Sequence, residues 1–261
     1  MDKSRHYTVF HLKKNTLVKE ELDLITEKYL ALTIDNKPCF ETKYTPGDED
    51  CLAAGICFTK GIVRDSREIK AIEYPANGDI NTVNVCLAET KQQTQDLTTD
   101  DISMQLNQKN KSSQMDIEKR FSDDNIRLTF EDLYSSMELL NQNQELHQKT
   151  RGAHAALLFD ANLDIVSFAE DVARHNAFDK ALGKALLSDR LANVRIAILS
   201  SRINQELLSK AISARIPVIA GISRPTAGVV DLGVKLNMTV ICAARGEGFF
   251  VFCGPQRLMA S

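Results

Sequence analysis

The sequence lacks any run of about 18 apolar residues, the minimum that a membrane-spanning helix needs. Its N-terminus, MDKSRHYTVFHLKKNTLVKEE, is basic, but it has no apolar core of roughly 7 to 15 residues such as a secretory signal peptide carries. We therefore expect a cytoplasmic protein with no membrane partner.

The sequence also lacks a C-x-x-C pair, and no histidine lies at ligand spacing from a cysteine. Six cysteines are scattered along the chain, at Cys39, Cys51, Cys57, Cys86, Cys242 and Cys253. This distribution argues against a zinc site and against a disulfide framework. Most of the cysteines are expected in the core, since free cysteine commonly behaves as a small apolar residue.

A strong excess of either charge is absent as well, because the net charge is −3 with 26% charged residues. Such a chain should not bind polyanions indiscriminately, so no nucleic acid partner is expected. The last sixty residues differ, with seven Lys or Arg against three Asp or Glu from Arg202 onward. This part of the chain favours an anionic ligand.

Residues 90–125 contain no glycine, proline or cysteine and one aromatic residue, Phe121. A stretch rich in Gln, Asn, Lys, Ser and Asp buries too little apolar surface to offset its ordering entropy. We therefore predict a polar loop or linker at 90–125, between a small α+β N-terminal domain at 1–89 and a second domain at 126–261.

The N-terminal domain shows strand patterns around one helix. Residues 29–44 alternate about an Asp35-Asn36 turn as a hairpin does, and residues 80–88 predict a further strand. Between them, residues 48–62 have helical spacing, with acids in the first turn and Gly61 placed to end the helix.

The C-terminal domain alternates apolar strands with amphipathic helices, which is typical of a sheet buried on both faces with a parallel part. Helices are predicted at 129–142, 173–187, 203–215 and 226–237, and strands at the two ends of 154–171 and at 194–201, 217–223 and 239–246. The fold class is thus α/β, or α+β over the whole chain. The element order matches the three-layer core of the cytidine deaminase-like fold, although a Rossmann-like variant fits the pattern too.

Polar and basic residues gather at the ends of the three parallel strands. They are Arg202, then Ser223, Arg224 and Thr226, and then Arg245 beside Gly246 and Gly248. Those strand ends share one edge of a parallel sheet, where helix N-termini and arginine forks bind phosphate. We infer a nucleotide ligand, while the alternative is that Ser201 and Ser223 cap helices and the arginines are solvated.

Two histidines form a further set of candidates. His175 and Asp179 lie one helical turn apart, close to Arg174, and could orient a ligand or move a proton, or could form a structural pair. His154 begins a predicted strand.

Zinc-dependent deamination requires a Glu two residues after the first zinc ligand and a P-C-x-x-C pair. Ala156 stands two residues after His154, where that Glu would be needed, and the sequence has no P-C-x-x-C pair. No metal is therefore expected.

Several segments together resemble the formate dehydrogenase accessory protein family, FdhD. They are KYTPGDEDCLAAGICFTKGIV, TRGAHAALLFD, EDVARHNAFDKALG, SSRINQELLSKA, SRPTAGVVDLGVKLNMTVICAARG and GPQRL, in order from about Glu20 to Leu258. The resemblance implies a small domain attached to a cytidine deaminase-like domain without zinc, in a homodimer. It also implies a sulfur relay from a cysteine desulfurase to the molybdenum cofactor, bis-molybdopterin guanine dinucleotide, before that cofactor enters formate dehydrogenase.

The resemblance places the cofactor-binding segment on Ala243, Ala244, Arg245, Gly246, Glu247 and Gly248, and makes GDP a mimic of the ligand. Sulfur-transferring members carry a C-G-x-C-G motif, but the corresponding place here, 111–116, reads KSSQMD. Serine holds no persulfide, and Cys86 is the nearest thiol in sequence. Three hypotheses remain: a sulfur-transferring maturation protein, a non-catalytic cofactor or guanine nucleotide chaperone, and a nucleotide-binding regulator unconnected with formate dehydrogenase.

Overall fold

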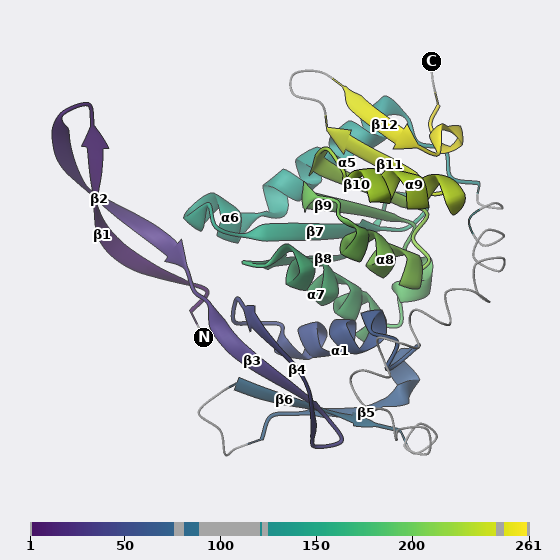
Figure 1. Ribbon diagram of the computed structural model, residues 1–261, viewed down its shortest axis with the longest axis horizontal. Coiled ribbons are helices and arrows are strands. Elements are labelled where there is room, and N and C mark those ends of the chain that lie inside the picture. Colours follow the sequence, from purple (N-terminus) through teal and green to yellow (C-terminus); the bar gives the residue numbers. More distant parts are fainter. Residues whose placement is uncertain (1, 76–80, 89–120, 122–124, 244–247, 260–261) are drawn as a thin grey trace.

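The computed structural model describes residues 2–75, 81–88, 121, 125–243 and 248–259. These residues form a mixed α/β fold with six α-helices and three sheets of two, four and six strands. Figure 1 shows the six-stranded sheet in the larger lobe, the four-stranded sheet in a smaller lobe, and the two-stranded sheet as a projecting arm. None of the described helices is long and apolar enough to cross a membrane.

The six-stranded sheet has the order β12-β11-β10-β9-β7-β8. Its strands are β7 (His154–Phe159), β8 (Ile165–Asp171), β9 (Ile196–Arg202), β10 (Val218–Ser223), β11 (Thr239–Ala243) and β12 (Phe249–Cys253). β9, β10 and β11 are parallel, whereas β7 runs antiparallel to β8 and β9. The start of β7 therefore lies at the same edge as the carboxyl ends of β9, β10 and β11.

Helices cover both faces of this sheet, as predicted for a buried sheet. They are α5 (Phe130–Asn143), α6 (Glu145–Thr150), α7 (Arg174–Leu187), α8 (Gln205–Ser213) and α9 (Ala227–Lys235). Side chains alternate along β7: Leu157 packs with α5 in one apolar cluster, and Leu158 packs with α7 and α8 in the other. The predicted helices and strands are confirmed, while α6 and β12 were not anticipated.

The smaller lobe contains β3 (Lys28–Ile34), β4 (Lys37–Tyr44), β5 (Ile69–Glu73), β6 (Asn81–Leu87) and α1 (Glu49–Thr59). The hairpin is confirmed, with Asp35 and Asn36 at φ of 47° and 65°, as the tight turn requires. The helix ends before Gly61 at φ of +73°, also as predicted. β5 was not predicted, because five residues, IKAIE, give too short a pattern.

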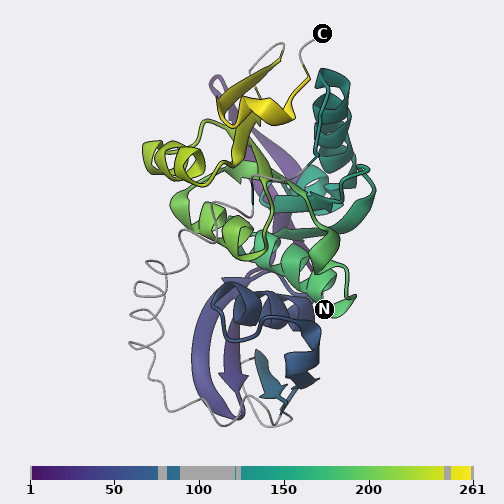
Figure 2. The same ribbon diagram turned by 90° about the vertical axis from the view of Figure 1, so that its right-hand side faces the viewer.

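The two lobes meet where α1 packs against α7 (Figure 2). Two glycines allow the close approach: a Cβ on Gly55 would lie 1.9 Å from the Asp179 carbonyl oxygen, and one on Gly183 would lie 1.8 Å from the Cys51 carbonyl oxygen. Apolar residues of both lobes belong to one core cluster. The predicted linker at 90–125 lies outside the described residues except for Phe121 and Asn125.

Candidate functional site

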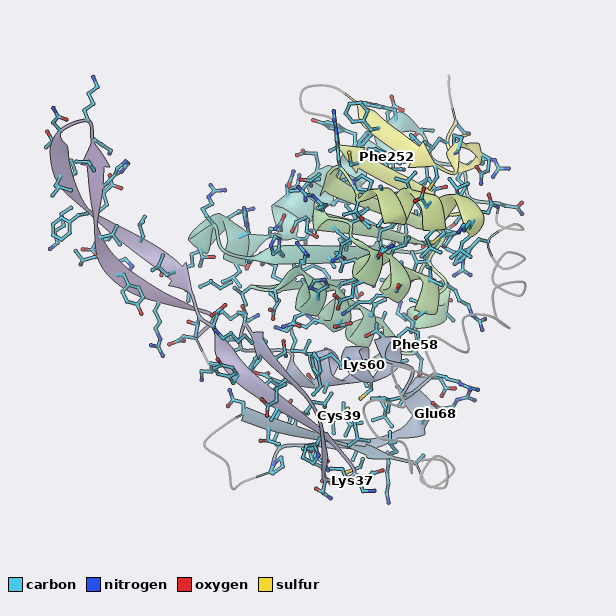
Figure 3. All side chains as sticks on the ribbon, in the orientation of Figure 1. Lys37, Cys39, Phe58, Lys60, Glu68 and Phe252 are labelled. Carbon is cyan, nitrogen blue, oxygen red and sulfur yellow. The ribbon has the colours of Figure 1, made fainter. Side chains whose placement is uncertain are left out.

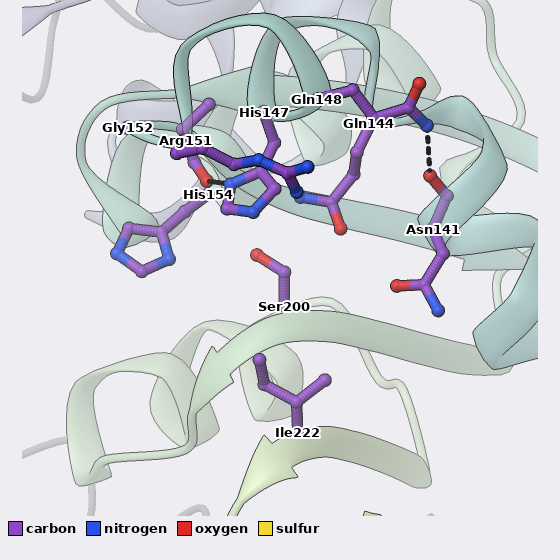
Figure 4. A pocket seen from close by; sticks show the side chains of 10 residues that line it. Asn141, Gln144, His147, Gln148, Arg151, Gly152, His154, Ser200 and Ile222 are labelled. Atoms are coloured by element: carbon purple, nitrogen blue, oxygen red, sulfur yellow. Dashed lines mark hydrogen bonds between the residues drawn. The ribbon is translucent and has the colours of Figure 1, made fainter. Parts of the chain in front are cut away.

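A pocket of about 510 Å³ lies at the sheet edge that the strand ends indicated (Figure 4). Described residues that line it come from α5, α6, the loop after α6 and three strands: Asn141, Gln144, His147, Gln148, Arg151, Gly152, Ala153, His154, Ser200 and Ile222. The volume is in the usual range for ligand pockets, which is roughly 300 to 1,000 Å³. No carboxylate occurs among these described lining residues, so the lining favours an anionic or acceptor-rich ligand.

The short helix α6 forms one wall of the pocket and is held at both ends. The Glu170 carboxylate accepts hydrogen bonds from the Leu146 and His147 main-chain N–H groups at 2.9 and 2.8 Å. At the other end, Arg151 adopts the left-handed conformation at φ of 55°. Glu170 therefore anchors the start of α6.

His147 has a defined orientation in this wall. Its Nδ1 lies 2.8 Å from the Ala153 carbonyl oxygen, which can only accept, so the proton resides on Nδ1. Figure 4 shows the other ring nitrogen turned toward the pocket, on the same side as the Ser200 hydroxyl. Ser200 is itself fixed because its Oγ accepts the Ala155 N–H at 2.7 Å.

Two buried donors at this edge have no partner. Within the part of the chain that the structure describes, three buried side-chain polar atoms lack a hydrogen bond, and two of them are Gln144 Nε2 and Arg174 Nε. Gln144 is 5% exposed and lines the pocket. An unsatisfied buried donor costs about 1 to 3 kcal/mol, a cost that an acceptor on a ligand would remove.

His154 lies in the pocket, as its position at the start of β7 suggested. Burial lowers the pKa of its imidazole, and the nearby charges of Arg174, His147 and His175 lower it further. The ring is therefore predominantly neutral at pH 7, and an anion bound beside it would restore its affinity for a proton.

His175 is not paired with Asp179, so that predicted pairing is wrong. The His175 Nε2 atom lies 3.1 Å from Glu206 and 3.3 Å from the Asn204 amide, both from the start of α8. Asp179 is buried and accepts from Lys210 at 2.5 Å and Thr59 at 3.0 Å. Burial lowers the pKa of His175, although the charge of Glu206 opposes this.

The polar strand ends meet as predicted, outside the described lining of the pocket. Arg202 and Ser223 are register partners at the ends of β9 and β10. Arg224 lies with its guanidinium carbon 5.2 Å from the Phe250 ring centroid, and Thr226 is the exposed N-cap of α9. The alternative that Ser201 and Ser223 cap helices is wrong, because Asn204 caps α8 by accepting the Leu207 N–H at 3.0 Å and Thr226 is the N-cap of α9. Arg202 and Arg224 are exposed, as that alternative also expected.

The predicted cofactor segment connects two paired strand ends. Ala243 ends β11 and pairs with Phe249 of β12. Gly248 has φ of +103°, and a Cβ there would meet none of the described residues within 4 Å. The remaining members, Ala244, Arg245, Gly246 and Glu247, lie outside the described residues.

Thiols are found in both lobes, and the pKa of each is raised above its ordinary value. Burial raises the pKa of Cys86, and the neighbouring Glu73 and Asp35 carboxylates raise it further, which disfavours a thiolate. Cys39, labelled with Lys60 in Figure 3, has its pKa raised by burial despite that lysine. Burial also raises the pKa of Cys51, to about 12, and of Cys57, Cys242 and Cys253.

Three of these cysteines are buried and three are half-buried, so the core holds fewer of them than expected. Across the described ranges, no group of three or more His, Cys, Asp or Glu side chains could hold a metal ion. Gln144 was not predicted as a site residue, since glutamine within NQNQELHQK is typical of a solvated helix face.

Comparison with known proteins shows the relationships of the chain. A family model described as the FdhD/NarQ family matches residues 25–259. A protein named Sulfur carrier protein FdhD from Streptomyces avermitilis is 34% identical over 252 residues, covering 90% of this chain and 88% of the relative. A protein of the same name from Thermoplasma volcanium is 32% identical, covering 82% and 80%. A solved structure from Desulfotalea psychrophila, described as a formate dehydrogenase accessory protein, aligns with a TM-score of 0.77 at 19% identity, covering 99% of this chain and all of that chain, and shares its fold.

Proposed function

The chain belongs to the FdhD/NarQ family, and from this premise we propose that it is an accessory protein of formate dehydrogenase maturation. In this role it binds the molybdenum cofactor, bis-molybdopterin guanine dinucleotide, through a nucleotide part that occupies the pocket under α6. The cofactor is cargo for the client enzyme, and GDP serves as its mimic. The name and description of the relatives support the maturation role.

The observation that carries the cofactor proposal is the pair of unpartnered buried donors, Gln144 Nε2 and Arg174 Nε, at the edge where three parallel strands end. Such an edge is the usual ligand site of open α/β sheets. Gln144 would donate to a carbonyl or ring nitrogen of the base, because its Nε2 can only donate. Arg151 and His154 would face the phosphates, since cationic and imidazole groups complement their charge.

Binding of GDP to the full chain, measured by isothermal titration calorimetry, tests this placement. Gln144→Leu removes the donor at nearly constant volume, and the loss of one hydrogen bond of about 1.4 kcal/mol weakens binding about tenfold. Gln142→Leu is the matched control, since Gln142 is exposed and absent from the lining. Equal affinities of the two variants would refute the role of Gln144.

Arg245→Ala examines the segment that the family resemblance identified. We expect loss of GDP binding, because a bidentate arginine is a strong phosphate ligand. Unchanged affinity would remove the segment Ala243–Gly248 from the site, while leaving the pocket to be judged by Gln144→Leu.

Sulfur carriage is a second candidate function, favoured by the name of the two relatives, Sulfur carrier protein FdhD. It would need a cysteine of this chain to hold a persulfide, and Cys86 remains the nearest to the 111–116 segment. The chain is incubated with a cysteine desulfurase and cysteine, and persulfides are mapped by mass spectrometry. A persulfide that disappears on addition of cofactor supports sulfur transfer, whereas GDP binding without any transferable sulfur supports the non-catalytic chaperone.

The same proposal includes a cytoplasmic location, a cysteine desulfurase as partner and a homodimer. It also includes a cytidine deaminase-like arrangement of residues 126–261. The antiparallel pair β7–β8 beside parallel β9, β10 and β11 favours that arrangement over a Rossmann-like variant.

A further inference from the structure

The chain begins with an arm built from β1 (Ser4–Lys13) and β2 (Thr16–Ile25), which the sequence patterns did not predict. The strands pair along their whole length, and Figure 1 shows the arm projecting away from both lobes. Near its base, Lys149 of α6 lies 3.4 Å from Asp23. An isolated two-stranded hairpin is at best marginally stable in water, so an arm of this length favours a partner surface.

In the half of the arm nearest the body, apolar side chains share one pleat face. Tyr7 pairs with Leu22, and Leu24 lies two residues further along the same face. The opposite face of this half is polar: Thr8 donates to Glu21 at 2.7 Å, and His6 lies 3.2 Å from Glu21.

In the outer half, the two faces exchange character. Phe10, Leu12 and Leu17 lie on the face that is polar nearer the body, and they are 68%, 64% and 65% exposed. The other face now carries His11 and Lys13, both of which contact Glu20. Of the exposed large apolar side chains of the arm, Val18 alone departs from this pattern.

The twist of the arm reunites the apolar residues. Two-stranded ribbons twist strongly, and Figure 1 shows the strands crossing about midway between base and tip. At this crossing the ribbon turns over, so each pleat face passes to the other side of the arm. The apolar residues move from one pleat face to the other near the same point, between Tyr7 and Phe10. The result is one apolar side along the arm, formed by Tyr7, Phe10, Leu12, Leu17, Leu22 and Leu24, which we name the apolar side.

Charge divides the arm in a self-complementary way. Residues 10–19, the tip, hold three lysines and no acid. The base, residues 2–9 and 20–27, holds five acids against two basic residues. Two arms placed antiparallel about a two-fold axis would therefore set each basic tip beside an acidic base, which is the condition for an isologous interface.

We propose that a second copy of this chain covers the apolar side, with the two arms antiparallel about a two-fold axis. The proposal specifies the surface of the homodimer included in the proposed function, and it rests on that part alone. Binding of GDP does not depend on the arm. A failed GDP titration would therefore count against the nucleotide site, and a monomeric chain would count against the dimer surface.

Sedimentation velocity of the full chain tests the surface. We expect a dimer for the unaltered chain and at least tenfold weaker dimerisation for Leu12→Thr with Leu17→Thr, which keeps strand-forming residues but removes apolar area. His11→Thr, on the opposite side of the tip, is the control and should remain dimeric. A monomeric unaltered chain, or a double variant that dimerises like the control, would overturn the proposal.

Charge reversal tests the antiparallel arrangement. Lys14→Glu with Lys19→Glu makes the tip acidic, and Glu21→Lys with Glu27→Lys makes the base basic. Each variant alone should dimerise weakly, since like charges meet at both contacts. An equimolar mixture should form a heterodimer, because each tip then meets a base of opposite charge. Failure of the mixture to associate, while both variants remain folded by circular dichroism, would exclude this arrangement.

Discussion

Replacement of Gly183 by alanine should destabilise the junction between the two lobes. Gly183 lies on α7 against α1, and a Cβ there would sit 1.8 Å from the Cys51 carbonyl oxygen and 2.7 Å from its carbon. Both atoms belong to the main chain of a helix, so neither can rotate away. The helices themselves would have to separate.

The size of the effect follows from this geometry. Ordinary contact begins at 3.4 Å, so the helices must part by about 1.6 Å near Gly183. Overpacking of a core costs roughly 1 to 3 kcal/mol, and a rigid neighbour places this site at the upper end. Alanine is the better helix former by about 1 kcal/mol, which offsets part of the cost. We expect a net loss of about 2 kcal/mol in the free energy of unfolding.

Urea denaturation followed by circular dichroism measures this loss, and Gly228→Ala supplies the matched control. Gly228 also lies in a helix, α9, but its Cβ would meet Gln205 Nε2 at 2.3 Å, the movable end of a side chain. The control should therefore be neutral or slightly stabilising. If Gly183→Ala unfolds at the same urea concentration as Gly228→Ala, the close packing of α1 and α7 does not limit stability and the reasoning fails.

Two further predictions concern buried charge and pH. Lys180→Met should lower the free energy of unfolding, measured by urea denaturation, by about 3 to 5 kcal/mol. Lys180 Nζ lies 2.7 Å from the buried Asp171 carboxylate, and its removal leaves that charge without its ion-pair partner. A loss below about 1 kcal/mol would contradict this reasoning. Stability should also fall as the pH falls below about 6.5, the ordinary pKa of histidine. Burial lowers the pKa of His154 and His175 in the folded protein, so the unfolded chain binds protons at a higher pH than the folded chain does. Urea denaturation at pH 7.5 and at pH 5.5 measures the difference in the free energy of unfolding between the two pH values. His154→Gln should make this difference smaller, and an unchanged difference would mean that other groups cause it.

Periodicity was sufficient to predict four helices and five strands of the larger lobe, because those strands are largely apolar and those helices amphipathic. It failed for the arm, where the apolar residues change pleat face between Tyr7 and Phe10 and so break the alternation of a half-buried strand. It also failed for β12, whose residues FFVFC lack alternation altogether.

The candidate site was predictable only in part, for a related reason. The rule that parallel strands end at one edge located Arg202 and Ser223 side by side. Nothing in that rule indicates which helix closes the edge, and α6 is held there in part by Glu170, which binds its first N–H groups. Helical spacing likewise suggested that Asp179 serves His175, but spacing does not reveal that Lys210 of a neighbouring helix binds the carboxylate.

The position of α7 links the smaller lobe to the site. Asp171 accepts the Ala173 N–H at 2.9 Å, which fixes the first turn of the helix that carries Arg174 and His175. The same carboxylate accepts the Thr45 N–H at 3.0 Å, from the chain just after β4 of the smaller lobe. Because one buried side chain bonds both segments, a displacement of the smaller lobe would be transmitted to Arg174, one of the two unpartnered donors. The smaller lobe therefore helps to position Arg174, whose charge acts on His154 of the pocket.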